Sequence, residues 1–415
     1  MLCGKGSWIS CTIGGDRSPL KRTMRILFLS RWFPCPPSNG SKLRIYNLLR
    51  GLSQHHEVTL LSFADQPELE VDTLSLQSLC RKVQVVPWKP FNPHSQRARL
   101  GFFSSTPRSV LDTFSIEMAQ AIQQLLSSEK YDIVIASQID MAVYNRYFCH
   151  LPALFEELEI GVIYERFARA SSLGQRIRNG LTWAKYRRYL AALLQNYKVC
   201  TVVSNRERQL VRQAVKNYRS IEVIPNCIDT ASYADVCESP QPNSLVFTGS
   251  FTYLPNYEAM YWFISEVYPR VQAQIPEIQL TITGNHANRS LPSANNVFLS
   301  GFVDDVRPLV ARAGVSVVPL HTGGGTRLKI LEAMALGTPV VATSKGAEGL
   351  DIEVGKHLSV ADTPEAFAGE IVRLLREPGL RQRLADNARQ LVRDKYDWNV
   401  IAPYFLELVE QVAYA

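Results

Sequence analysis

Short apolar segments alternate with longer amphipathic segments along the whole chain, and this alternation restricts the fold more than any other feature. Strands that alternate with helices are typical of parallel sheets in α/β proteins. The pattern predicts strands at 26–29, 58–62, 83–86, 133–136, 201–204, 222–225, 245–248, 279–283, 297–299, 315–319, 340–342 and 357–360. It predicts helices at 42–53, 174–197, 257–274, 306–312, 364–375, 379–395 and 398–413. The sequence therefore predicts an α/β protein.

The series of strands starts afresh after a polar, proline-containing stretch at 239–244. A chain of 415 residues suits two domains of about 200 residues each. We expect two Rossmann-like domains at 24–229 and 230–395, followed by a last helix at 396–415. Open parallel sheets bind ligands beyond the carboxyl ends of their strands, so two such domains face each other across an interdomain cleft.

The first 23 residues contain neither a sustained apolar core nor a clear periodicity. A signal peptide needs such an apolar core, and this segment does not resemble one. We expect 1–23 to be a disordered extension, with a natural start at Met24, directly before the first strand.

A glycine-rich segment near the end of the second domain is the strongest functional signal. Its residues are Gly323, Gly324, Gly325, Thr326, Arg327, Lys329 and Glu332. Glycines let the backbone approach a ligand closely, and the free N–H groups at the start of a helix attract anions. The two cations would steady a diphosphate, and the carboxylate can accept hydrogen bonds from sugar hydroxyls. The pattern indicates a phosphorylated, hydroxyl-rich ligand, although most of this helix has the spacing of one packed against a sheet.

Composition excludes several other classes. A formal net charge of +7 favours anionic ligands or an acidic membrane surface and is too small for a nucleic-acid coat. The 8 cysteines are scattered without a CxxC pair or a Cys–His cluster, which indicates reduced thiols in the cytoplasm and no zinc site. No apolar run reaches the ~18–20 residues of a membrane-spanning helix. The segment 166–198 mixes cations with leucines and aromatic residues, so peripheral contact with an anionic membrane competes with an ordinary helix that has a charged outer face.

Five short motifs resemble glycosyltransferase family 4, whose members are retaining nucleotide-sugar glycosyltransferases of the GT-B fold. They are PPSNGSKLR at 36–44, VS at 203–204, IPNCID at 224–229, GFVDD at 301–305 and LEAMALGTPVV at 331–341. The last motif is highly specific, and the order of the others is right. The resemblance implies transfer of a sugar from a nucleotide-diphosphate donor to an acceptor hydroxyl, in polysaccharide or glycolipid biosynthesis. It also implies that the last helix crosses back to the first domain.

Two departures from the family pattern affect the site. The family usually carries two glutamates separated by seven residues; Glu332 matches the second, but Gly324 stands in place of the first. Many members also carry cations after the first strand of the second domain, where this chain has none at 249–256. We therefore expect Arg327 and Lys329 to bind the diphosphate in place of those cations. In this respect the chain resembles a branch of the family that has GGGTRLK at this place.

The resemblance implies further contacts around the cleft. Gly249, Gly284 and Val303 would approach the donor, and Gly40, Ser41 and Arg44 would form a first-domain loop that touches the donor phosphate. For Arg44 the alternative is a solvated helix charge. Glutamates at 156, 157 and 159 suit a solvated acidic turn better than an acceptor site.

No residue stands out as a general base, because His150 and His321 suit loop histidines. In retaining enzymes of this fold the leaving phosphate is thought to take the acceptor proton. The pair Asp304 and Asp305 suits a helix cap better than a metal site, so we expect neither a metal nor a cofactor.

Competing functions remain open on the same architecture. One is a non-catalytic nucleotide-sugar-binding protein, and another is a nucleotide-sugar epimerase, which would need carboxylates and histidines placed for elimination. A dinucleotide-dependent dehydrogenase would need a GxGxxG turn after the first strand, which the chain lacks.

Overall fold

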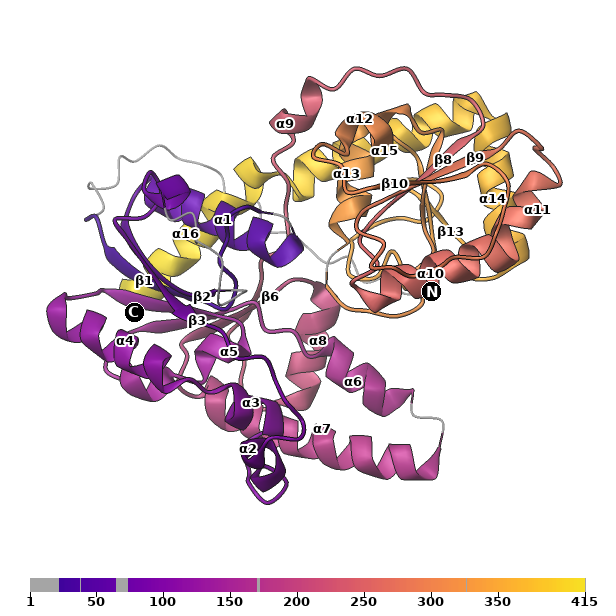
Figure 1. The fold of residues 1–415 in the computed structure, drawn as a ribbon. Helices are drawn as coiled ribbons and strands as arrows, with labels where there is room; N and C mark the ends of the chain where they lie inside the picture. Colours follow the sequence, from indigo (N-terminus) through magenta and orange to yellow (C-terminus); the bar gives the residue numbers. More distant parts are fainter. Residues whose placement is uncertain (1–21, 38, 65–73, 170–171, 326, 415) are drawn as a thin grey trace, which may run out of the picture.

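The computed structural model describes residues 22–37, 39–64, 74–169, 172–325 and 327–414. It forms two lobes, each built from a parallel sheet with helices on both faces (Figure 1). This confirms the predicted α/β class with two parallel sheets. The predicted disordered extension at 1–23 falls almost wholly outside the described residues.

The first domain contains a seven-stranded parallel sheet in the order β3-β2-β1-β4-β5-β6-β7. Its strands are β1 Arg25–Ser30, β2 Glu57–Ala64, β3 Lys82–Pro87, β4 Ile133–Ser137, β5 Ala153–Glu156, β6 Val199–Val202 and β7 Ile221–Val223. Its helices are α1 Gly40–Ser53, α2 Gln96–Leu100, α3 Arg108–Thr113, α4 Ile116–Ser128, α5 Ile139–Ala142, α6 Gly161–Ala168, α7 Leu173–Leu194 and α8 Asn205–Ala214, with 3₁₀ turns at Leu74–Leu76 and Asn145–Tyr147. The short helix α9 Ala231–Ala234 lies in the linker that leads to the second domain.

Strand β1 illustrates why the first sheet is buried on both faces. Side chains of a strand alternate between the faces, and helices cover both sides of a parallel sheet. Leu27 and Leu29 belong to the apolar core on one face, whereas Ile26 and Phe28 belong to the core on the other. Successive residues of this strand must therefore all be apolar, and residues 26–29 are.

The second domain contains a six-stranded parallel sheet in the order β10-β9-β8-β11-β12-β13. Its strands are β8 Ser244–Thr248, β9 Gln279–Thr283, β10 Val297–Gly301, β11 Val315–Val318, β12 Val340–Ala342 and β13 Ser359–Val360. Its helices are α10 Leu254–Trp262, α11 Tyr268–Gln272, α12 Arg307–Arg312, α13 Leu328–Leu336, α14 Pro364–Arg376 and α15 Pro378–Lys395. The single helix predicted at 257–274 is interrupted by a π-helical turn at Phe263–Val267. Pro269 lies two residues beyond this turn, and proline has no N–H to donate to a helical hydrogen bond.

The last helix, α16 Trp398–Tyr414, belongs to the core of the first domain although it follows the second in sequence. Its Trp398, Phe405 and Val409 are buried with α1 and the β1 face of the first sheet. The returning chain pairs with the outgoing linker, because Ile228 and Asp397 form a parallel bridge. Figure 1 shows α16, in yellow, lying beside α1 in the first lobe. Among the described residues, no helix is both long and apolar enough to cross a bilayer.

Candidate functional site

Three glycines meet at the carboxyl ends of β8, β9 and β10. A Cβ atom on Gly284 would stand 2.7 Å from the carbonyl carbon of Gly249, and Gly284 has a φ of 109°. The Gly284 N–H also donates to the Gly301 carbonyl oxygen at 2.7 Å. A side chain at 284 would therefore be both strained and obstructed. The glycines thus let three strand ends pack closely against one another. Val303 lies two residues beyond Gly301, half-buried, and the approach of Gly249, Gly284 and Val303 to a donor stays a prediction.

Lys329 reaches this junction from the first turn of α13. Its Nζ donates to Asn256 Oδ1 at 3.0 Å and lies 4.0 Å from the ring centre of Phe247. A Cβ atom on Gly249 would stand 2.8 Å from the same Nζ. Burial, together with the charge of Arg327, lowers the pKa of Lys329 to about 7. The ammonium group is thus held with little solvation, and a bound anion would stabilise its charged form.

The glycine-rich segment differs from the sequence prediction in one respect. Helix α13 begins at Leu328, with Arg327 in the cap position, so Gly323–325 form a loop before the helix and do not open it. Two of these glycines have positive φ, 100° at Gly323 and 76° at Gly325. The free N–H groups of the first helical turn therefore belong to Leu328 and its successors, not to Gly324–326. Thr326 lies outside the described residues.

Arg327 is buried and holds the glycine loop. Its Nη2 donates to the Gly323 carbonyl oxygen at 2.9 Å, and its Nη1 contacts the Gly324 carbonyl oxygen. Within the described part of the chain, its buried Nε has no hydrogen-bond partner. The guanidinium thus shapes the loop, and its role towards a diphosphate stays a prediction.

Glu332 lies one turn further along α13, on the side of the linker helix α9. Its Oε1 accepts a hydrogen bond from the Tyr233 hydroxyl at 3.4 Å. Burial raises the pKa of this carboxyl above its usual value. Glu332 therefore lies on the same helix as Lys329, but its hydrogen-bond partner is Tyr233, whereas that of Lys329 is Asn256.

The first domain meets this helix with the start of α1. A Cβ atom on Gly40 would stand 3.2 Å from Leu328 Cδ1, so the beginnings of α1 and α13 are in contact across the interface. Ser41 is half-buried beside it. Gly40 and Ser41 therefore belong to the first turn of α1 and not to a loop, and this turn lies at the start of α13.

The surroundings of Arg44 match neither the predicted contact with the donor phosphate nor the alternative of a solvated helix charge. It is 5% exposed, its Nε donates to Glu156 Oε1 at 2.6 Å, and its Nη1 donates to Asn226 Oδ1 at 2.9 Å. The solvated helix charge is therefore wrong, and the guanidinium is directed into the first domain, towards β5. It is a buried structural ion pair in this arrangement, because the apolar sheet requires Glu156 to have a charged partner.

Of the three acidic residues predicted to form a solvated turn at the end of β5, Glu159 is exposed, but Glu156 and Glu157 are not. Glu156 is fully buried and accepts a hydrogen bond from Ser137 Oγ at 2.5 Å. Burial and the neighbouring Glu156 raise the pKa of Glu157 to about 8. Sequence reasoning failed here because three polar residues at the end of a short strand look the same whether the strand end is covered or open.

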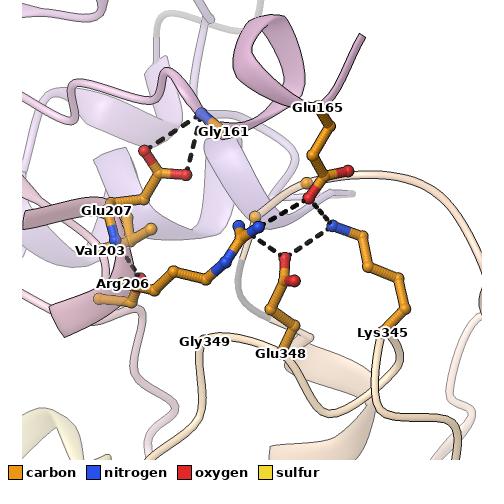
Figure 2. A pocket seen from close by; sticks show the side chains of 11 residues that line it. Gly161, Glu165, Val203, Arg206, Glu207, Lys345, Glu348 and Gly349 are labelled. Carbon is orange, nitrogen blue, oxygen red and sulfur yellow. Dashed lines mark hydrogen bonds and ion pairs between the residues drawn. The ribbon is translucent and has the colours of Figure 1, made fainter. Parts of the chain in front are cut away.

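A cluster of four charged residues joins the two domains at a cavity that sequence reasoning did not find (Figure 2). Arg206 donates to Glu165 Oε1 at 2.9 Å and to Glu348 Oε1 at 2.8 Å. Lys345 contacts the same two carboxylates, at 2.6 Å from Glu348. Glu165 and Arg206 belong to the first domain, whereas Lys345 and Glu348 follow β12 in the second. No motif marks them, because they are brought together only by domain packing.

The remaining candidates lie on the surface. His150 and His321 are exposed, and Asp305 accepts the Arg307 N–H at 3.0 Å as a cap of α12. Among the described residues, no group of three or more His, Cys, Asp and Glu could hold a metal ion.

Family models match most of the chain in two adjoining parts. Residues 38–232 match the model described as Glycosyltransferase Family 4, and residues 242–377 match the model described as Glycosyl transferases group 1. The boundary between the two matches coincides with the linker that precedes β8.

Curated relatives cover part of the chain. Over 208 residues it is 30% identical to the phosphatidyl-myo-inositol mannosyltransferase of Mycobacterium tuberculosis, covering 46% of this chain and 54% of that protein. Over 165 residues it is 27% identical to an uncharacterized 44.6 kDa protein in the cps region of Klebsiella pneumoniae, covering 37% of this chain and 42% of that one. The chain thus spans about half the length of the curated relatives it matches.

Solved structures share the whole architecture. The Anabaena protein HepE in complex with UDP and glucose superimposes with a TM-score of 0.65 at 17% identity, covering 94% of this chain and 100% of that one. Sucrose-phosphate synthase from Thermosynechococcus elongatus gives a TM-score of 0.67 at 18% identity, with coverages of 94% and 99%. These likenesses establish the fold of two facing parallel-sheet domains.

Proposed function

Because the chain belongs to glycosyltransferase family 4, we propose that it is a retaining, metal-independent glycosyltransferase that uses a nucleotide-diphosphate sugar. The observation that carries this proposal is the position of Lys329, a poorly solvated cation beside Gly249 at the carboxyl end of β8. A diphosphate there would gain a charge-assisted contact and the N–H groups at the start of α13. The similarity to HepE, which was crystallised with UDP and glucose, supports such a donor.

In the proposed reaction, the bond between the anomeric carbon and the diphosphate oxygen breaks, and its electron pair leaves with the nucleotide diphosphate. The acceptor oxygen bonds to the anomeric carbon, and its proton passes to the leaving phosphate oxygen. Lys329, Arg327 and the helix start would stabilise the negative charge that grows on the leaving oxygen. Glu332 would hold hydroxyl groups of the donor. Closure of the domains would keep water from hydrolysing the donor.

Release of nucleotide diphosphate from UDP-, GDP- and ADP-sugars tests the activity, and a nucleotide-sugar-binding protein would release none. Lys329→Ala and Arg327→Ala should each lower turnover about 10²–10³-fold if they stabilise the leaving group. Lys356→Ala, at an exposed lysine outside the site, is the control. Unchanged turnover in both site variants would contradict these roles, and loss of activity in EDTA with recovery in magnesium would contradict the metal-free reaction.

We further propose a sugar or lipid-linked acceptor at the cytoplasmic face of an anionic membrane, in polysaccharide or glycolipid biosynthesis. The mycobacterial relative is named as a mannosyltransferase of phosphatidyl-myo-inositol, and this name supports a lipid-linked acceptor. Residues 166–205 contain eight Lys and Arg but no Asp or Glu. Such a segment is attracted to anionic lipid headgroups.

The outer face of α7 is the one that could touch lipid. Trp183, Tyr186 and Leu190 are buried in the first domain and cannot contact a membrane. Exposed apolar residues include Leu173 at 76%, Ile177 at 58% and Leu181 at 69% on α7, and Phe103 at 94% in the loop after α2. Lys185 of α7 contacts the Gly101 carbonyl oxygen, which ties that loop to the helix.

Vesicle flotation with anionic and neutral lipids tests the membrane contact. The protein should float with anionic vesicles at low salt, and Phe103→Ser combined with Leu181→Ser should abolish flotation. Val354→Ser, at an apolar residue 62% exposed on the second domain, is the matched control. No flotation of the unaltered protein would refute the membrane contact and leave the transfer reaction untouched.

A further inference from the structure

Gly324 is enclosed by the first domain. A Cβ atom at this position would stand 2.6 Å from Glu159 Oε1 and 2.6 Å from Val162 Cγ2. Contacts this short are not seen for real Cβ atoms, so a side chain at 324 would require the Glu159 and Val162 side chains to shift. Where the family usually has a glutamate, the space beside Gly324 is occupied by the carboxylate of a glutamate from the other domain.

Glu159 supplies a carboxylate at the place that position 324 leaves empty. It follows β5 and precedes α6, and its carboxylate accepts a hydrogen bond from the Gly325 backbone. The charges of Arg327 and Lys345 lie near it. The residue itself remains exposed, so a ligand in the cleft can reach it.

Three other carboxylates near the cleft already have strong partners within the protein. Glu156 is paired with Arg44, Glu165 with Lys345 and Arg206, and Glu207 accepts the Ile160 N–H at 3.0 Å. Glu159 instead shares a backbone amide of the very loop at which a diphosphate would bind. That amide is a partner which a ligand can replace.

We propose that Glu159 binds hydroxyl groups of the donor sugar, as a first-domain substitute for a carboxylate at position 324. This inference rests on the proposed function. The sugar is bonded directly to the diphosphate, so it must lie beside the glycine loop when the diphosphate is held at the start of α13. A carboxylate accepts two or more hydrogen bonds from neighbouring hydroxyls. On donor binding, the sugar hydroxyls replace the Gly325 N–H at Glu159, and that N–H becomes available to a phosphate oxygen.

Glu159 should contribute to the affinity for the nucleotide sugar but not to that for the free nucleotide diphosphate, and calorimetry can measure both affinities. We would compare the affinities of UDP-glucose with UDP, and of GDP-mannose with GDP, for the unaltered protein, Glu159→Gln and Glu159→Ala. Loss of a charged hydrogen bond should weaken the nucleotide sugar about 10- to 100-fold. The affinity of the free nucleotide diphosphate should change by less than about twofold, because it has no sugar. Glu353→Gln, at an exposed carboxylate that pairs with Lys356, is the control.

Three results would overturn this role of Glu159. Equal loss for nucleotide sugar and nucleotide diphosphate would indicate a general structural effect. Unchanged affinity for both would show that Glu159 touches neither ligand. Tighter binding of both would show that the carboxylate merely occupies the anion position. If the unaltered protein bound no nucleotide sugar, the proposed function itself would fall, which is a different result from any of these three.

Discussion

At the scale of single residues, the site depends on cations and carboxylates that the fold keeps from water. Arg44 and Glu156 are surrounded by protein and compensate each other's lost hydration, whereas the half-buried Lys329 has the neutral Asn256 as its hydrogen-bond partner. An ion that loses its hydration must gain hydrogen bonds or a counter-charge, or its pKa shifts.

Donor affinity should depend on pH through Lys329. Its pKa of about 7 in the folded protein is far below the ordinary value of a lysine, because burial disfavours the charged form. A bound diphosphate raises this pKa, so binding takes up a proton above about pH 7 and none below it. Affinity for a nucleotide sugar should be constant below pH 7 and fall by up to about tenfold per pH unit above it.

Calorimetry between pH 6 and 8.5 measures this, with a nucleotide sugar chosen because its diphosphate does not titrate in that range. Lys329→Arg should remove the pH dependence, since arginine stays charged. An equally steep fall in that variant would assign the effect to another group. For folding the sign is the reverse: the unfolded lysine holds its proton up to a higher pH, so stability should rise from about pH 7 towards alkaline pH.

Removal of Arg44 should destabilise the first domain strongly. Arg44→Met leaves the fully buried Glu156 without its cation, and breaking a buried pair in this way costs about 3–5 kcal/mol in the free energy of unfolding. Urea denaturation measures the change. The control is Arg50→Met on the same helix, whose pair with Asp229 is part-exposed and worth less than about 1 kcal/mol. Equal effects of the two substitutions would contradict the buried pair.

At the scale of helices and strands, amphipathic helices seal both faces of each parallel sheet. Helix α16 is the informative case, because it is last in sequence yet covers the first sheet. The spacing of its apolar residues indicates that one face of the helix packs on a sheet. The spacing does not identify which of the two sheets that is. The packing makes the first domain dependent on a segment that follows the second.

Substitutions on α16 should therefore act on the first domain. Phe405 is 2% exposed, and Phe405→Ala should lower the free energy of unfolding by about 3–5 kcal/mol. Val400 on the same helix is 44% exposed, and Val400→Ala should change it by less than about 0.5 kcal/mol. Hydrogen exchange of β1 measures where the loss occurs. Faster exchange confined to the second domain would contradict the packing of α16.

At the scale of the whole molecule, the two domains are held together by polar contacts and by the crossing of α16. The cluster of Glu165, Arg206, Lys345 and Glu348 bridges the interface (Figure 2). These ion pairs are part-buried, so salt screens them less than it screens exposed pairs, and the crossing helix adds an apolar connection between the domains. The cluster is thus suited to stabilise one relative position of the domains while the helix keeps them attached.

Lys345→Met should loosen the domains. Lys345 is 7% exposed, and its removal leaves Glu165 and Glu348 to share Arg206. We expect the interface to weaken by about 1.5–3 kcal/mol and the radius of gyration in small-angle scattering to increase. Lys356→Met, which removes an exposed pair with Glu353, should leave scattering unchanged. The same scattering curve for both variants and the unaltered protein would exclude this role of the cluster.

The sequence by itself determined the two parallel-sheet domains and the loop-and-helix segment that carries Lys329, because strand and helix periodicities and glycine punctuation are local properties of the chain. It missed β5 and placed the helix start too early, since four-residue strands and glycine turns carry little periodicity. Only the tertiary structure decided that Arg44 pairs with Glu156, that four charges join at the interface, and that Glu159 lies at Gly324. A residue has the same neighbours in sequence whether it is buried or solvated, and its partner across a domain boundary is set by how whole sheets and helices pack.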